Sequence, residues 1–148
     1  MVRKVAKNMK GKYMKEITVE AKIENLDKVQ SFIEEQLESI GCSMKTQLQV
    51  NVSVEELFVN IARYAYQDKV GEATVKLDYS QGDTILEITF VDEGVQYNPL
   101  KKEDPDVTLS AEERQIGGLG IFLVKKNMDD IKYEYKDGKN ILSIKKKI

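Results

Sequence analysis

The chain has 148 residues, the length of one ordinary domain with a single hydrophobic core. Its 23 basic and 25 acidic residues give a net charge of −2, so the composition predicts no direct binding to nucleic acid or to an anionic membrane surface. The sequence contains no histidine, which excludes a His-based triad, a zinc site built on His, and a phosphohistidine relay through its own residues.

The sequence shows neither a membrane-spanning pattern nor a signal-peptide pattern. No apolar run approaches the roughly 20 residues that span a bilayer, and the N-terminus lacks the apolar core of a signal peptide. We therefore expect a cytoplasmic protein. Its only cysteine, Cys42, follows an apolar helical pattern and is expected to be a small packed side chain.

The first part of the chain divides into a basic segment, a strand and two helices. Residues 1–13 carry Arg3 and four lysines, and we expect them to form an extension outside a single domain over 14–148. Alternation over 16–23 predicts a half-buried strand. Apolar residues at helical spacing predict a helix over 26–40, with Asn25 as its N-cap, and a longer helix from about 45 to 67.

The second part of the chain is richer in strands. Alternation predicts strands over 73–79, 86–90 and 131–136, and a last apolar run, 141–148, follows the hairpin signal Asp137-Gly138. Strands with one apolar and one polar face imply a sheet that is covered on one side only. We therefore predict a two-layer α/β sandwich, with a mixed, mostly antiparallel sheet of about five strands and the helices on one face.

Polar residues on the second predicted helix form the first candidate for a site. Glu56 and Asn60 are four residues apart and so share one helix face, roughly 6 Å from each other. An amide oxygen is a hard ligand for Mg²⁺, and a carboxylate one turn away could accept a proton from an attacking hydroxyl. The alternative interpretation is a solvated helix edge.

Two glycine-containing segments form the other candidates. The stretch VDEGVQYNP places Asp92 and Gly94 at the end of a predicted strand, which a simple turn would also explain. Gly117, Gly118 and Gly120 open an apolar helix, where free backbone N–H groups suit a phosphate, although tight packing is the alternative. The connection between them, 94–116, is long enough to suggest a functional lid or a disordered segment.

These segments, in this order, resemble a known family. Glu56 to Asn60, Asp92 to Gly94 and Gly117 to Gly120 look like the N, G1 and G2 boxes of the GHKL ATPase superfamily, which includes gyrases, certain chaperones and histidine kinases. The compact length and the stretches DEGVQYNP and GGLGIFLVKKNMDDI are most similar to the bacterial anti-sigma factor serine-protein kinases. The resemblance covers about residues 14–148.

The resemblance implies roles for the residues that match the boxes. Asp92 would accept a hydrogen bond from the exocyclic amine of adenine, with Gly94 admitting the ring. Asn60 would hold Mg²⁺ against the phosphates of ATP, and Glu56 would be the general base. The phosphates would be cradled by Gly117, Gly118, Leu119 and Gly120. Arg114 resembles an arginine that meets the γ-phosphate, although it could also be a solvated charge of the lid.

The function implied by the resemblance is an ATP-dependent protein serine kinase that sequesters a sigma factor and phosphorylates an anti-anti-sigma antagonist, as a homodimer. Two alternatives remain open: a histidine kinase catalytic fragment with its acceptor in trans, and a module that binds ATP without transferring phosphate. The chain departs from many relatives at Tyr64-Ala65, where they carry His-Gly, so the local shape of the pocket edge is expected to differ.

Overall fold

The computed structural model describes residues 2–5, 12–101 and 118–148. In these ranges the strands form one sheet in the order β1-β2-β3-β4-β6-β5, and each neighbouring pair is antiparallel. The strands are β1 (Val2–Val5), β2 (Lys12–Glu20), β3 (Glu72–Ser80), β4 (Ile85–Asp92), β5 (Asp130–Lys136) and β6 (Lys139–Lys147). The helices are α1 (Leu26–Ile40), α2 (Met44–Tyr64) and α3 (Gly118–Asn127), with short 3-10 turns η1 (Ile23–Asn25) and η2 (Pro99–Lys101).

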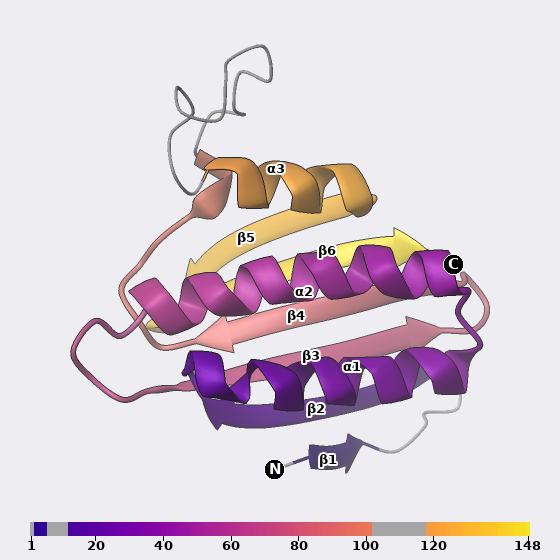
Figure 1. The fold of residues 1–148 in the computed structure, drawn as a ribbon, viewed down its shortest axis with the longest axis horizontal. Helices are drawn as coiled ribbons and strands as arrows, with labels where there is room; N and C mark the ends of the chain where they lie inside the picture. The colour runs from indigo at the N-terminus through magenta and orange to yellow at the C-terminus, as the bar shows by residue number, and fades with distance from the viewer. Residues whose placement is uncertain (1, 6–11, 102–117) are drawn as a thin grey trace.

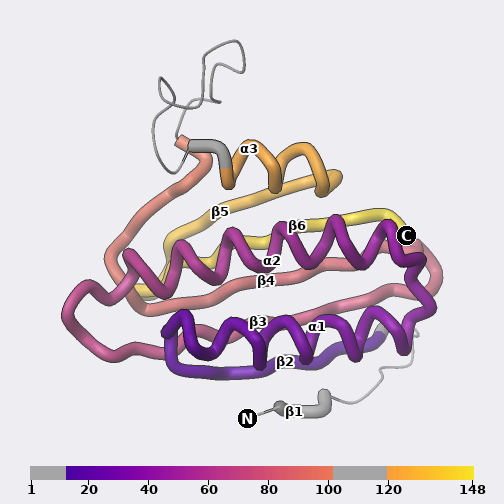
Figure 2. The backbone as a smooth tube through the Cα atoms, in the orientation of Figure 1, coloured from indigo at the N-terminus to yellow at the C-terminus, as the bar shows by residue number. Residues whose placement is uncertain are grey.

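The three α-helices lie over the same face of the sheet (Figure 1). The backbone trace shows α1 over β2 and β3, α2 over β4 and β6, and α3 over β5 (Figure 2). The predicted two-layer α/β sandwich with its helices on one face is therefore confirmed. Within the described ranges the sheet has six strands instead of about five, and its pairings are all antiparallel instead of mixed.

The additional strand comes from the N-terminal segment. β1 pairs with β2 from Val2 opposite Ile17 to Val5 opposite Met14, and β2 itself begins at Lys12. Regular structure therefore starts before the domain boundary that was placed at residue 14. That boundary, and the description of 1–13 as an extension, remain predictions.

The core lies between the sheet and the helices, as strand alternation predicted. Inward-facing side chains of β3 and β4 are almost fully buried and belong to one cluster with the apolar faces of the helices. Each such side chain is worth about 1.5–3 kcal/mol of hydrophobic stabilisation when fully buried. The cluster includes Val75, Leu77, Leu86, Ile88 and Phe90 from the strands, and Val29, Ile33, Leu37, Val50, Val54, Phe58 and Val124 from the helices.

Helix ends and turns follow local chemistry, with one exception. Asp137 and Gly138 both have positive φ, 54° and 77°, which is the geometry of the predicted hairpin turn. Asn25 does precede α1, but its side chain makes no capping bond and instead donates from Nδ2 to the Glu20 carbonyl at 2.8 Å. Asn25 therefore occupies the predicted N-cap position of α1 but lacks the side-chain capping bond, because its amide is oriented toward the Glu20 carbonyl.

Two smaller expectations concern Cys42 and membrane spans. The Cys42 side chain is 8% exposed, and burial raises the pKa of its thiol, as expected for a packed, unreactive cysteine. In the described parts of the chain, no helix is both long enough and apolar enough to span a membrane.

Candidate functional site

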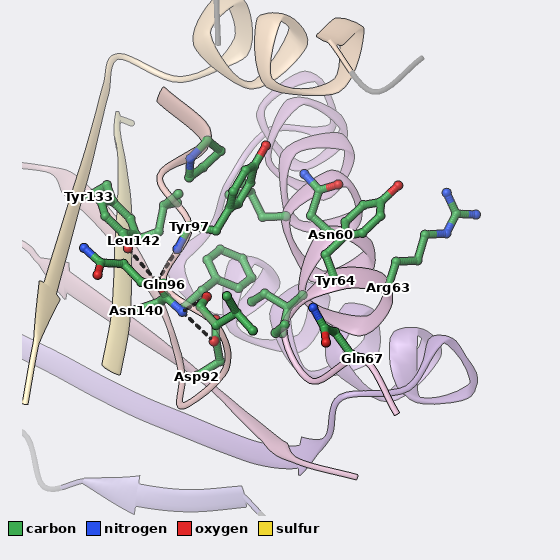
Figure 3. A pocket seen from close by; sticks show the side chains of 16 residues that line it. Asn60, Arg63, Tyr64, Gln67, Asp92, Gln96, Tyr97, Tyr133, Asn140 and Leu142 are labelled. Atoms are coloured by element: carbon green, nitrogen blue, oxygen red, sulfur yellow. Dashed lines mark hydrogen bonds between the residues drawn. The ribbon is translucent and has the colours of Figure 1, made fainter. Parts of the chain in front are cut away.

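A cavity of about 440 Å³ opens between the C-terminal half of α2 and the ends of three strands (Figure 3). Its apolar lining combined with a few polar groups is typical of a site for a small molecule. The lining residues are Leu57, Asn60, Ile61, Arg63, Tyr64, Ala65 and Gln67 on the α2 side, Phe90, Asp92, Tyr133, Asn140 and Leu142 on the strands, and Val95, Gln96, Tyr97 and Pro99 on the loop after β4.

Asp92 occupies the last position of β4 and lines this cavity. Its side chain is 6% exposed, and its Oδ1 accepts hydrogen bonds from the Gly94 N–H at 2.9 Å and from Asn140 Nδ2 at 3.0 Å. No described residue donates to Oδ2, so this oxygen is available to a ligand. Burial raises the pKa of the carboxyl, and the hydrogen bonds from Asn140 and Gly94 act in the opposite direction.

Gly94 lies directly against the end of α2. A Cβ at this position would be 2.3 Å from the Ala65 carbonyl oxygen and 2.6 Å from the Ala65 Cβ. The next residue, Val95, donates its N–H to the same carbonyl at 2.8 Å. Glycine is therefore required here for close backbone approach, and its proposed role in admitting a base ring remains a prediction. The departure Tyr64-Ala65 falls at this contact, where a larger side chain than alanine would have little room.

We expect Gly94→Ala to lower the free energy of unfolding by about 1–3 kcal/mol, because the clash is with backbone atoms and no rotamer change relieves it. Gly82→Ala is the matched control, since a Cβ at Gly82 meets no atom within 4 Å. Urea denaturation of both variants and the parent measures the difference. Equal midpoints for Gly94→Ala and Gly82→Ala would contradict the packing role.

Glu56 and Asn60 lie one turn apart on α2 but have different neighbours. Asn60 lines the cavity, on the side opposite Asp92 and Asn140 (Figure 3). Glu56 is half-buried against the start of α3, where a Cβ on Gly120 would be 2.2 Å from Glu56 Oε2. The structure thus brings Glu56 together with the glycine segment, and Asn60 into the same cavity as Asp92.

The glycine segment is described only in part. Gly118, Leu119 and Gly120 form the first turn of α3, which packs beside α2, so the predicted apolar helix is observed there. Gly117, Arg114 and most of the predicted lid lie outside the described residues. The phosphate-binding role of this segment remains a prediction.

The residues that could hold a metal ion are few. The described residues contain no group of three His, Cys, Asp or Glu side chains that could form a metal site of their own. The Asn60 side chain makes no hydrogen bond with a described residue, so its amide oxygen is available. A hard ion such as Mg²⁺, which commonly takes most of its ligands from phosphates and water, fits a site with a single protein oxygen.

Three residues around the cavity were not predicted from the sequence. Asn140 pairs with Asp92 across β4 and β6, and the Tyr133 hydroxyl donates to Asn140 Oδ1 at 2.5 Å. The Tyr66 hydroxyl donates to the Glu72 carbonyl at 2.5 Å and accepts from the Glu93 N–H at 2.8 Å, which ties the end of β4 to the start of β3. Asn140 could have been noticed, because it continues the inward-facing alternation of Leu142 and Ile144.

Comparison with known proteins agrees with this geometry. The family model described as the histidine kinase-like ATPase domain matches residues 19–146. The two-layer sandwich with a cavity between a helix and the strand ends is therefore the fold of a nucleotide-binding domain. The chain belongs to the histidine kinase-like ATPase family.

Within that family, the chain is similar to proteins named serine-protein kinase RsbW. The Bacillus mycoides protein is 33% identical over 100 residues, a match that covers 65% of this chain and 61% of the relative. The Listeria monocytogenes protein is 31% identical over 110 residues, which covers 71% of this chain and 69% of the relative. The chain thus spans about three fifths of the length of the Bacillus relative.

A solved structure shares the fold. The crystal structure of the RsbU and RsbW domains of Rv1364c from Mycobacterium tuberculosis superposes with a TM-score of 0.67 at 15% identity. The match covers 90% of this chain and 32% of that one. At this identity the likeness supports the architecture alone.

Proposed function

We propose that this protein is an ATP-dependent anti-sigma regulatory factor, which sequesters a sigma factor and phosphorylates a serine on an anti-anti-sigma antagonist. The observation that carries the proposal is the free Oδ2 of buried Asp92 in an apolar cavity that also contains Asn60. The similarity to relatives named serine-protein kinase RsbW supports the kinase activity, and the sigma factor and its antagonist are the partners that the family resemblance implies. We include in the proposal a cytoplasmic location and a homodimer.

The adenine base is proposed to lie between α2 and the strand ends. Leu57, Ile61, Phe90 and Leu142 supply apolar surface for a flat ring, and Asp92 supplies the polar group that fixes its orientation. A carboxylate oxygen accepts a hydrogen bond from the exocyclic amine of adenine. Guanine carries a carbonyl oxygen at that ring position, which would face the carboxylate with no proton between them.

The phosphates are proposed to extend from the cavity toward the N-terminus of α3. The free N–H groups and the helix dipole at that end favour an anion. Asn60 would contribute its amide oxygen to Mg²⁺, which when bound neutralises phosphate charge. This arrangement would place the γ-phosphate near Glu56, which lies against Gly120.

In the proposed transfer step, Glu56 is the general base. The serine oxygen of the antagonist forms a bond to the γ-phosphorus, and the bond from that phosphorus to the bridging oxygen breaks, so that ADP leaves. Glu56 accepts the proton of the serine hydroxyl. The phosphoserine then carries about −1.5 to −2 charges, which adds repulsion and a desolvation cost at the interface and releases the antagonist.

We expect ATP and ADP to bind about 10- to 150-fold more tightly than GTP, because losing a hydrogen bond to a charged acceptor costs about 1.5–3 kcal/mol. Isothermal titration calorimetry with the three nucleotides in the presence of Mg²⁺ measures this preference. Equal affinity for ATP and GTP would contradict the assignment of Asp92 as the base-recognising residue.

Phosphate transfer is tested separately with γ-labelled ATP and an anti-anti-sigma protein that carries a serine at its acceptor position. Label on the parent antagonist but not on its Ser→Ala variant would support the kinase. Nucleotide binding without label in any antagonist offered would favour instead a regulatory module that binds ATP without transferring phosphate.

A further inference from the structure

Asn140 is a buried amide at the start of β6, 7% exposed, and its nitrogen is fully used by the protein. Nδ2 donates to Asp92 Oδ1 at 3.0 Å and to the Val95 carbonyl at 2.9 Å, with the Gly94 carbonyl at 3.4 Å as a weaker third acceptor. An amide nitrogen has two hydrogens. Both are therefore directed at protein atoms.

The oxygen of the same amide is also fully used. Asn140 Oδ1 accepts from the Tyr97 N–H at 3.1 Å and from the Tyr133 hydroxyl at 2.5 Å (Figure 3). An amide oxygen has two lone pairs, and each has a donor here. Although Asn140 lines the cavity, it has no hydrogen-bonding capacity left for a ligand.

These bonds connect three separate parts of the site. They join β6 to the end of β4 through Asp92, to β5 through Tyr133, and to the backbone of the loop 93–98 at three points. The loop forms one wall of the cavity through Val95, Gln96 and Tyr97. One side chain thus helps to hold the wall in place and, together with the Gly94 N–H, engages Oδ1 of Asp92.

We propose that Asn140 is a positioning residue for base recognition: it occupies Oδ1 of Asp92, so that Oδ2 is presented to the base, and it fixes the loop 93–98 as the wall of the base pocket. This inference rests on the proposed binding of an adenine nucleotide. Asn140 acts through Asp92 and the loop, and it makes no hydrogen bond to the base. An amide that hydrogen-bonds the base would have to give up one of the protein bonds described above.

A double-mutant cycle with Asp92 tests this role, with ATP affinity as the readout. We expect Asn140→Ala to lower ATP affinity by about 5- to 30-fold in the parent chain, less than the loss of the direct bond between Asp92 and the base, because Asn140 acts through Asp92 and the loop. In the Asp92→Ala background, the same change is expected to lower affinity several-fold less than in the parent chain, because the part of the effect that acts through Asp92 is already lost and only the effect on the loop 93–98 remains. An equal loss in both backgrounds would overturn the proposal.

Two further variants separate positioning from folding. Tyr133→Phe removes only the hydroxyl that donates to Asn140, so it should fold normally, weaken ATP binding by a few-fold and have a smaller effect without Asp92. Ser143→Ala is the control on the opposite face of β6, where Ser143 hydrogen-bonds Thr89 at 3.1 Å, and it should leave ATP affinity unchanged. A Tyr133→Phe effect of the same size in the Asp92→Ala background would overturn the coupling to Asp92. If no adenine nucleotide binds the parent chain, the proposed function is wrong, and the positioning role of Asn140 in base recognition is wrong with it.

Discussion

Glu56→Gln is expected to lower phosphate transfer to the antagonist by about 10²- to 10⁴-fold, the usual contribution of a positioned general base. The substitution keeps the size of the side chain and its contact with Gly120, but the amide cannot accept the serine proton. ATP affinity is expected to stay the same or to rise, because a negative charge near the phosphates is removed. Sequestration of the sigma factor should also persist, since it requires bound nucleotide and not its turnover.

The measurement pairs calorimetry of ATP binding with the rate at which label passes from γ-labelled ATP to the antagonist. Glu55→Gln is the matched control, because Glu55 is the neighbouring carboxylate on α2 and is exposed to solvent. It should transfer phosphate at the parental rate. If Glu56→Gln also transfers at that rate, Glu56 is not the base, and the ATP-binding module without transfer becomes the better description.

Sequence periodicity predicted the helices and strands of this fold closely where an element buries one face and exposes the other. The helix predicted over 26–40 is observed as α1 with the same bounds, and each predicted strand is observed within a few residues. β1 was not predicted, because its four residues show no apolar face and pair only with the edge of the sheet at β2. The role of such a strand depends on its neighbour and not on its own sequence.

The candidate site was predictable to the extent that motifs identify it. Asp92, Gly94 and Asn60 were chosen from local patterns, and the structure places Asp92 and Asn60 in one cavity. Asn140 was not chosen, because its contact with Asp92 joins residues 48 apart in the chain and depends on the register between β4 and β6. Alternation assigns a residue to a face of the sheet, but register decides which side chain it meets.

The glycines illustrate a second limit of motif reading. From the sequence, Gly120 could serve either phosphate binding or close packing. Its Cα lies against the Glu56 carboxylate, so packing is already one reason for glycine at this position. Phosphate binding at the start of α3 does not conflict with that contact, because it uses backbone N–H groups and not the side-chain position. Both interpretations can therefore hold for the same residue.

Asp92→Asn is expected to separate stability from nucleotide binding. The new amide oxygen can still accept from Gly94 and Asn140, as Oδ1 does now, so the local structure should be retained. The amide nitrogen would then occupy the Oδ2 position and point a donor at the amine of adenine. We expect ATP affinity to fall by about 10- to 150-fold, from the loss of about 1.5–3 kcal/mol.

At neutral pH, Asp92→Asn is expected to stabilise the fold although it weakens ATP binding. Burial raises the pKa of Asp92 in the folded protein above its ordinary value of 3.8. The folded state therefore holds the proton more tightly than the unfolded state. The stabilisation from the protonated carboxyl is fully present below the ordinary pKa and is lost as the pH rises through the raised pKa. At neutral pH the buried charge is a cost, and Asp92→Asn removes it.

We accordingly expect the nucleotide-free Asp92→Asn variant to be at least as stable as the parent at pH 7, with any advantage disappearing as the pH falls below the raised pKa. ATP binding to the parent should weaken over the same pH range, because protonation of Oδ2 turns the acceptor into a donor. Urea denaturation and ATP titration at several pH values, on both proteins, measure the two effects. A variant that is less stable than the parent at pH 7, yet binds ATP normally, would show that Asp92 supports the fold and does not recognise the base.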